Sequence, residues 1–209
     1  TGLTEDWEMI TYPAIVLFVY NRPKHTLKTL ETLKNNIGSE NYDLFIFSDG
    51  PKTLADENKI SEVRDTLKTA EGFRSVRITE SSENKGLAES VIGGVSKVLE
   101  IYESVIVLED DIITSKHFLN YMSACLSLFK NASTIYSISG YSFPLKTETV
   151  SDENIYLLPR PSSWGWGTWR EKWSTADWEI KDYKAFLKSN VAIRKFNSGG
   201  DDLTPMLIN

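Results

Sequence analysis

The chain has 209 residues, of which 41% are hydrophobic and 25% are charged, and its formal net charge is -6. This length suits one globular domain, and the composition is that of a soluble protein rather than a disordered one. The acidic balance, without a clustered basic segment, argues against a nucleic-acid-binding protein. The longest apolar run, residues 15–20, is far shorter than the ~20 residues of a transmembrane helix.

The single cysteine and the two ends of the chain bear on its location. Cys125 has no partner for an internal disulfide, which favours a reducing compartment, and its apolar surroundings indicate a core residue. No signal peptide is visible, so we expect a cytoplasmic protein that can associate with the inner face of a membrane without spanning it. Residues 206–209 resemble a helix interior, and we expect the natural chain to continue beyond them.

Strands and helices are predicted to alternate through the first half. Apolar runs rich in β-branched and aromatic residues predict strands over residues 14–20, 43–47, 75–79 and 105–108. Helical spacing between them predicts three helices, marked by Leu27, Leu30, Leu33 and Ile37, by Ile60, Val63 and Leu67, and by Leu87, Val91, Val95, Val98 and Leu99. The alternation predicts an α/β fold with a Rossmann-like, doubly wound, mostly parallel sheet. Gly93 and Gly94, inside the third helical pattern, indicate close packing.

The pattern changes after residue 111. A helix is predicted over residues 118–129 and a strand over residues 134–139. Five tryptophans then cluster within 15 residues, and three of them, Trp166, Trp169 and Trp173, fall at helical spacing. This spacing predicts a helix that buries its tryptophans in the core.

Acidic residues follow the fourth predicted strand. In doubly wound sheets ligands bind beyond the carboxyl ends of the strands, which is where Glu109, Asp110 and Asp111 stand. Adjacent carboxylates repel one another unless a cation neutralises them. Their oxygens suit Mn²⁺ or Mg²⁺, with phosphate and water completing the coordination. The alternative, an acidic turn or helix start, fits less well after a buried strand.

Other strand ends offer groups for an anionic nucleotide. Asp49, followed by Gly50, could accept a hydrogen bond from a nucleobase N–H or simply form a turn. Arg22 could contact a diphosphate or lie at the surface where a helix begins. Lys85 could face a phosphate, unless Asn84 merely caps the following helix.

Two segments of the second half are further candidates. Trp164 and Gly165 could line a sugar pocket, because aromatic faces stack on sugar rings, or they could pack in the core. Asp201 and Asp202 follow two glycines, so one of them could be a general base on a mobile hinge. From the residues alone, a cap for a helix over residues 203–208 is the stronger interpretation of this pair.

Four segments together resemble the nucleotide-sugar half of GT-A glycosyltransferases. They are residues 15–23 (IVLFVYNRP), 47–50 (FSDG), 84–87 (NKGL) and 107–111 (VLEDD). The order and spacing are most similar to the N-acetylglucosaminyltransferase I type and to bacterial family 2 enzymes, over about residues 14 to 205. The resemblance implies one GT-A domain over residues 1–209, in which 12–112 binds the nucleotide-sugar and 113–209, truncated at its end, faces the acceptor.

The resemblance also implies residue roles. Tyr20, Arg22, Asp49 and Lys85 would contact the base and diphosphate, Glu109 and Asp110 the nucleotide-sugar, Asp111 the metal, and Trp164 and Gly165 the sugar. Asp201 would be the catalytic base, with Asp202 as the neighbouring candidate. The chain departs from the family pattern at Gly200, where the relatives have a bulky residue beside the base.

Taken together, these expectations predict a metal-dependent, inverting glycosyltransferase that uses Mn²⁺ or Mg²⁺. It would move a sugar from a UDP-sugar, with UDP-GlcNAc as the first guess, to a hydroxyl of a glycan or other acceptor. One alternative is a sugar nucleotidyltransferase, which would carry a glycine-rich basic loop where this chain has Asn21, Arg22 and Pro23. The other is a nucleotide-sugar-binding module without turnover, against which the intact Asp111 and Asp201 argue.

Overall fold

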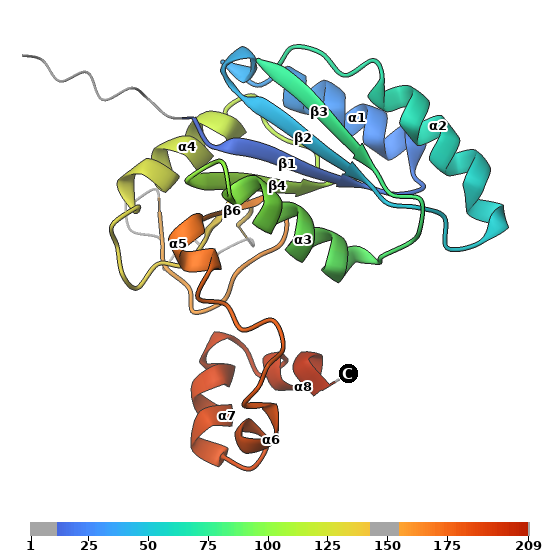
Figure 1. Cartoon of the computed structure of the whole chain (residues 1–209). Coiled ribbons are helices and arrows are strands. Elements are labelled where there is room, and N and C mark those ends of the chain that lie inside the picture. Colours follow the sequence, from blue (N-terminus) through green and yellow to red (C-terminus); the bar gives the residue numbers. More distant parts are fainter. Residues whose placement is uncertain (1–11, 143–154, 209) are drawn as a thin grey trace, which may run out of the picture.

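The computed structural model describes residues 12–142 and 155–208, with a six-stranded sheet at its centre (Figure 1). The strand order is β3-β2-β1-β4-β6-β5. The neighbouring pairs among β1 to β4 are parallel, whereas β6 is antiparallel to β4 and β5. The bounds are β1 (Ala14–Val19), β2 (Asp43–Ser48), β3 (Ser75–Glu80), β4 (Ser104–Glu109), β5 (Ile138–Ser139) and β6 (Trp166–Trp169). The predicted mostly parallel α/β sheet is confirmed.

Helices cover both faces of this sheet (Figure 1). One face carries α1 (Pro23–Lys34), α2 (Glu57–Leu67) and α4 (Phe118–Leu128), and the other carries α3 (Leu87–Leu99) and α5 (Arg170–Trp173). Alternate residues of β1 therefore enter two separate cores, and every side chain of this strand is buried. Burial on both faces explains why β1 is apolar along its whole length. Cys125 on α4 is buried in the core between the sheet and the helices α1, α2 and α4, as its surroundings in the sequence predicted.

The chain reverses its direction of travel across the sheet at β1. It passes through α1 to β2 and through α2 to β3 on one side, and α3 then returns it to β4 on the other side. The helices that follow β1 and precede β4, α1 and α3, lie on opposite faces. Doubly wound sheets bind their ligands at such a switch point, beyond the carboxyl ends of the two strands.

The prediction of a helix through Trp166, Trp169 and Trp173 is wrong for the residues before Arg170. Residues 166–169 form β6, and α5 begins only at Arg170. Backbone pairing with β4, in which Val107 lies opposite Trp166, outweighs the helical spacing of the aromatic residues. Trp169 is nevertheless in the core, with 4% of its surface exposed.

Two other sequence predictions need correction. The strand expected over residues 134–139 shortens to the two residues of β5. Leu27 and Ile37, which marked the buried face of the first helix, are 45% and 51% exposed, and α1 ends at Lys34. The buried face of α1 instead combines two leucines with two threonines, Thr26, Thr29, Leu30 and Leu33.

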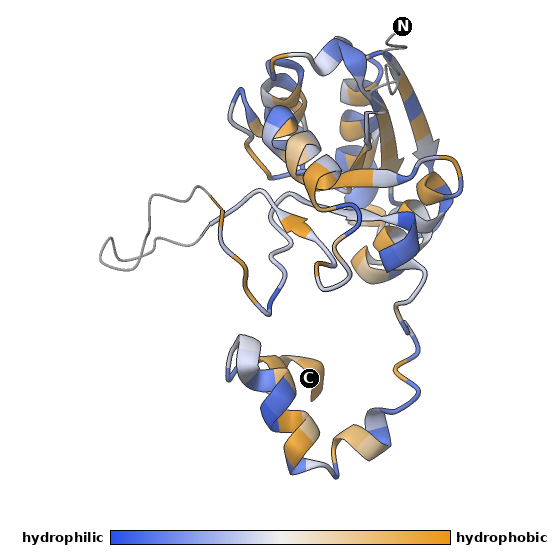
Figure 2. Cartoon of the chain, turned by 90° about the vertical axis from the view of Figure 1, so that its left-hand side faces the viewer, coloured by the Kyte–Doolittle hydropathy of each residue, from blue (hydrophilic) through white to orange (hydrophobic). Residues whose placement is uncertain are grey.

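Three short helices follow the sheet. They are α6 (Tyr183–Phe186), α7 (Asn190–Phe196) and α8 (Leu203–Ile208). Both views show them apart from the sheet (Figures 1 and 2). Asn209 lies outside the described residues, and the single domain over residues 1–209 stays a prediction. Nowhere in residues 12–142 and 155–208 is a helix both long enough and apolar enough to cross a bilayer.

Candidate functional site

Three acidic residues stand at the switch point. Glu109 ends β4, and Asp110 and Asp111 follow it. Because β1 and β4 are parallel, with Phe18 opposite Glu109, the segment that follows β1 lies beside these carboxylates. The fold therefore brings together two groups that the sequence placed 89 residues apart, the Arg22 guanidinium and the Asp111 carboxylate.

Arg22 bridges the two aspartates. Its Nη2 lies 2.8 Å from Oδ1 of Asp110, and its Nη1 lies 2.7 Å from Oδ2 of Asp111. The backbone N–H of Tyr20 donates to the other oxygen of Asp110 at 3.2 Å. The Asp110 side chain is 2% exposed, whereas those of Arg22 and Asp111 are 44% and 40% exposed. Asp110 is thus a buried anchor, and the other two groups face solvent.

The cluster carries more negative than positive charge. Burial raises the pKa of Asp110, and the Tyr20 N–H and the Arg22 charge oppose this rise. Burial also raises the pKa of Glu109, helped by the charges of Asp111 and Asp110. A raised carboxyl pKa means that ionisation is unfavourable in the folded protein, and an added cation would relieve this.

The donor atoms of this cluster fit a hard divalent cation. The carboxylates of Glu109 and Asp111 offer oxygen atoms, which Mn²⁺ and Mg²⁺ prefer, while both oxygens of Asp110 already have partners. Within the described ranges, no three acidic, histidine or cysteine side chains gather into a complete metal site. A metal here would therefore depend on substrate and water oxygens, as Mg²⁺ commonly does beside phosphates.

Hydrogen bonds hold the two loops of this site in place. The hydroxyl of Thr29 donates to the backbone oxygen of Asp110 at 2.8 Å and ties the loop after β4 to α1. The side chain of Asn21 donates to Asp56 at 2.7 Å, and the Tyr20 hydroxyl accepts from the Lys52 N–H at 3.1 Å. Sequence reasoning missed Thr29, although a threonine on the buried face of a helix was the signal.

Asp49 follows β2 and holds the start of α3. Its carboxylate accepts hydrogen bonds from the backbone N–H groups of Lys85 and Gly86, both at 3.0 Å. It also accepts from the Asn84 side chain at 3.1 Å and from the Gly50 N–H at 2.9 Å. A carboxylate has about four acceptor positions, so a nucleobase N–H would have to displace one of these donors. Asn84 binds Asp49 and is not the N-cap of α3, which is Gly86.

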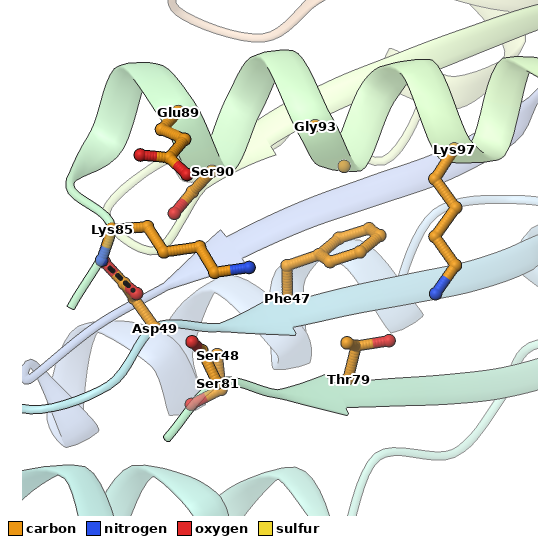
Figure 3. A pocket seen from close by; sticks show the side chains of 11 residues that line it. Phe47, Ser48, Asp49, Thr79, Ser81, Lys85, Glu89, Ser90, Gly93 and Lys97 are labelled. Carbon is orange, nitrogen blue, oxygen red and sulfur yellow. Dashed lines mark hydrogen bonds between the residues drawn. The ribbon is translucent and has the colours of Figure 1, made fainter. Parts of the chain in front are cut away.

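A cavity of about 260 Å³ lies beside Asp49, between α3 and the strands β2 and β3 (Figure 3). Lys85, from the loop before α3, and Lys97, from the last turn of α3, reach into it, and Phe47 lies between them. A Cβ on Gly93 would meet nothing within 4 Å, so α3 borders the cavity with backbone atoms alone at this position. The cavity combines an aromatic ring, several hydroxyls, the two ammonium groups and the carboxylates of Asp49 and Glu89, which suits a ring that carries hydrogen-bonding groups.

The antiparallel course of β6 brings Trp164 and Gly165 to the same edge of the sheet. Because Val107 pairs with Trp166, the residues before β6 lie beside those after β4, and a Cβ on Gly165 would lie 3.9 Å from the Ile112 side chain. Gly165 has a φ of 70°, which favours glycine. Trp164 is 52% exposed and packs edge-on against Tyr141 with a centroid distance of 4.6 Å.

Asp201 and Asp202 directly precede α8, one of the three short helices that the figures show apart from the sheet (Figures 1 and 2). Arg160 donates two hydrogen bonds to Asp202, at 2.7 and 2.9 Å, and thereby lowers the pKa of this carboxyl. Asp201 is exposed. α8 begins directly after the pair, yet Asn197, and neither aspartate, accepts the hydrogen bond from the Thr204 N–H.

No protein-family model and no curated protein matches the chain. A mannosyltransferase, PcManGT from Pyrobaculum calidifontis, solved with GDP-Man and Mn²⁺, is 12% identical with a TM-score of 0.48 and covers 77% of this chain. Two structures of S. aureus TarS, one of residues 1–349, are 13% and 14% identical, with TM-scores of 0.45 and 0.44 over 75% and 73% of this chain. The chain spans 46%, 47% and 28% of these three chains. Likeness at this level is one of backbone arrangement, and no functional argument rests on it.

Proposed function

We propose that this chain is the catalytic part of a GT-A-type glycosyltransferase that uses a nucleoside-diphosphate sugar. The observation that carries the proposal is the Arg22–Asp110–Asp111 cluster at the switch point of a doubly wound sheet. A guanidinium suits phosphate oxygens, and an exposed carboxylate beside it suits the cation that accompanies a diphosphate. An uncharged ligand would give neither the guanidinium nor the carboxylate a favourable charge interaction.

The rest of the donor would lie along the same edge of the sheet. The cavity beside Asp49 and Lys85 would take the nucleoside, with Asp49 keeping the loop before α3 in place. The exposed indole of Trp164 would stack on the sugar, and Gly165 would let the sugar approach the backbone. UDP-sugars, with UDP-GlcNAc among them, are the first donors to test because the sequence resemblance points to them.

Glu109 and Asp111 would hold Mn²⁺ or Mg²⁺, which would neutralise charge on the departing diphosphate. Arg22 would bind the same diphosphate and keep it in line with the acceptor. In an inverting reaction the acceptor oxygen attacks the anomeric carbon, the bond to the diphosphate breaks, and a carboxylate takes the hydroxyl proton. Asp201 is the better base than Asp202, because Arg160 occupies both oxygens of Asp202 and lowers its pKa.

Calorimetric titration of UDP, GDP and ADP, each with and without Mn²⁺, tests this function. We expect one diphosphate to bind with a clear dependence on Mn²⁺, and Asp111→Asn to weaken that binding at least about tenfold, since it removes a charged metal ligand. Asp65→Asn, an exposed aspartate on α2, is the matched control. Nucleotide binding that is equally strong in Asp111→Asn and wild type would refute the site, and binding of no nucleotide would refute the function.

A further inference from the structure

Arg22 makes two ion pairs that differ in exposure. The pair with Asp110 is anchored, because Asp110 is 2% exposed and also accepts the Tyr20 N–H. The pair with Asp111 joins two side chains that are 44% and 40% exposed. Ion pairs between exposed groups add little net stability, so the contact with Asp111 can open while the contact with Asp110 stays closed.

The exposed contact uses a carboxylate that a metal would need. Nη1 of Arg22 lies 2.7 Å from Oδ2 of Asp111. A divalent cation on the same carboxylate would lie within a few ångströms of the guanidinium, and the two positive charges would repel each other. Arg22 and a metal therefore compete for Asp111 as long as no anion lies between them.

A diphosphate removes this competition, because it carries negative charge that both cations can share. We propose that Arg22 is a resident cation that keeps metal off Asp111 in the free protein and turns to the diphosphate when a metal–nucleotide complex arrives. The ligand of the site is then the complex of metal and nucleoside diphosphate, rather than either component alone. This inference rests on the proposed function for its nucleotide half, while its metal half stands on the ion pairs.

The inference predicts coupled binding. In the wild type, Mn²⁺ alone should bind weakly, and a nucleoside diphosphate should strengthen Mn²⁺ binding, with the reciprocal effect of Mn²⁺ on the nucleotide. Removal of the Arg22 charge should tighten the binding of Mn²⁺ alone by about tenfold, a change in the usual range for linked sites. It should also reduce the coupling between Mn²⁺ and nucleotide binding. Nucleotide binding in the presence of Mn²⁺ should weaken, because the diphosphate loses its guanidinium.

Electron paramagnetic resonance of free Mn²⁺ measures the metal arm without any nucleotide. The test variant is Arg22→Gln. The control is Lys28→Gln, which removes one positive charge on the exposed side of α1. Arg22→Gln leaves the buried Asp110 carboxylate with one remaining donor. The double variant Arg22→Met/Asp110→Asn removes both charges of the Arg22–Asp110 pair and serves if the single variant does not fold.

Tighter Mn²⁺ binding in a folded Arg22 variant, and not in Lys28→Gln, supports the inference. Mn²⁺ binding no tighter than wild type in every folded Arg22 variant overturns it. If Mn²⁺ binding tightens as expected while no nucleoside diphosphate binds the wild type, the exclusion of metal by Arg22 stands and the proposed glycosyltransferase function fails.

Discussion

Two carboxylates at opposite ends of β2 show how differently single residues are used in this fold. Asp49, at the carboxyl end, accepts its hydrogen bonds from the backbone and side chains of its own loops. Asp43, at the other end, accepts from the Arg74 guanidinium at 3.0 and 2.5 Å, from Ser75 at 2.7 Å, and from the Tyr102 hydroxyl. Asp49 shapes the candidate site, and Asp43 stabilises the sheet.

The stability contributed by Asp43 should depend on pH. Arg74, with Tyr102 and Ser75, holds the pKa of Asp43 well below its usual range, although burial acts in the other direction. Asp43→Asn leaves part of this buried cluster unpaired and should lower the free energy of unfolding by about 2–3 kcal/mol at pH 7. Because the pKa is lowered in the folded state, the stabilisation is complete above the unfolded pKa of about 4 and declines below it.

Urea denaturation at pH 7 and pH 3 measures this difference. The gap between wild type and Asp43→Asn should narrow at pH 3. Glu71→Gln, which breaks an exposed pair with Lys34, should follow the wild-type curve at both pH values. A gap that stays constant with pH would show that Asp43 acts by packing and not by charge.

At the scale of elements, α3 approaches the sheet through a single glycine. A Cβ on Gly94 would lie 2.7 Å from Phe18 and 3.1 Å from Phe47, whose rings stack with centroids 5.4 Å apart. A Cβ on the adjacent Gly93 would meet nothing within 4 Å. The sequence indicated close packing for both glycines, and the structure confirms it only for Gly94.

The two glycines should therefore respond in opposite ways to alanine. Gly94→Ala should destabilise the protein by about 1–3 kcal/mol, because α3 must move off the phenylalanines. Gly93→Ala should stabilise it by up to about 1 kcal/mol, since alanine favours the helix and fills open space. Thermal unfolding of both variants decides the matter, and equal shifts for the two would contradict the packing of α3 described above.

In the whole molecule, the short helices α6, α7 and α8 lie apart from the sheet (Figures 1 and 2). In the proposed function, a general base on this segment would have to approach the donor, and the glycines at 199 and 200 would serve as the hinge. Asp202, which follows these glycines, pairs with Arg160. Asp201 takes no part in that pair.

Asp201→Asn should reduce sugar transfer by about 10²–10⁴-fold and leave nucleotide affinity unchanged, because a base acts on the acceptor proton alone. Asp202→Asn and Arg160→Gln break the same ion pair from its two sides and should resemble each other in transfer rate. Sugar-transfer assays of the wild type and the three variants make the comparison. Loss of transfer in Asp202→Asn but not in Arg160→Gln would make Asp202 the base, and full activity in both aspartate variants would exclude the pair from catalysis.

The amino-acid pattern alone was enough to predict the parallel core of this protein and the polar residues at its strand ends. A strand buried on both faces must be apolar throughout, so β1, β2 and β4 were visible without any knowledge of their partners. The polar residues that follow such strands must meet at one edge, which brought Arg22 and Asp111 into consideration together.

Features that depend on a distant partner could not be predicted from the sequence and became visible in the folded structure. Residues 166–169 are a strand because β4 offers its free edge, and no local pattern contains that information. Three sets of contacts join residues 35 to 89 positions apart: the bridge from Arg22 to two aspartates, the donors that residues 84–86 offer to Asp49, and the pairing of Asp202 with Arg160. Their hydrogen bonds depend on distances of a few ångströms, which are set by the packing of whole elements and not by the order of residues.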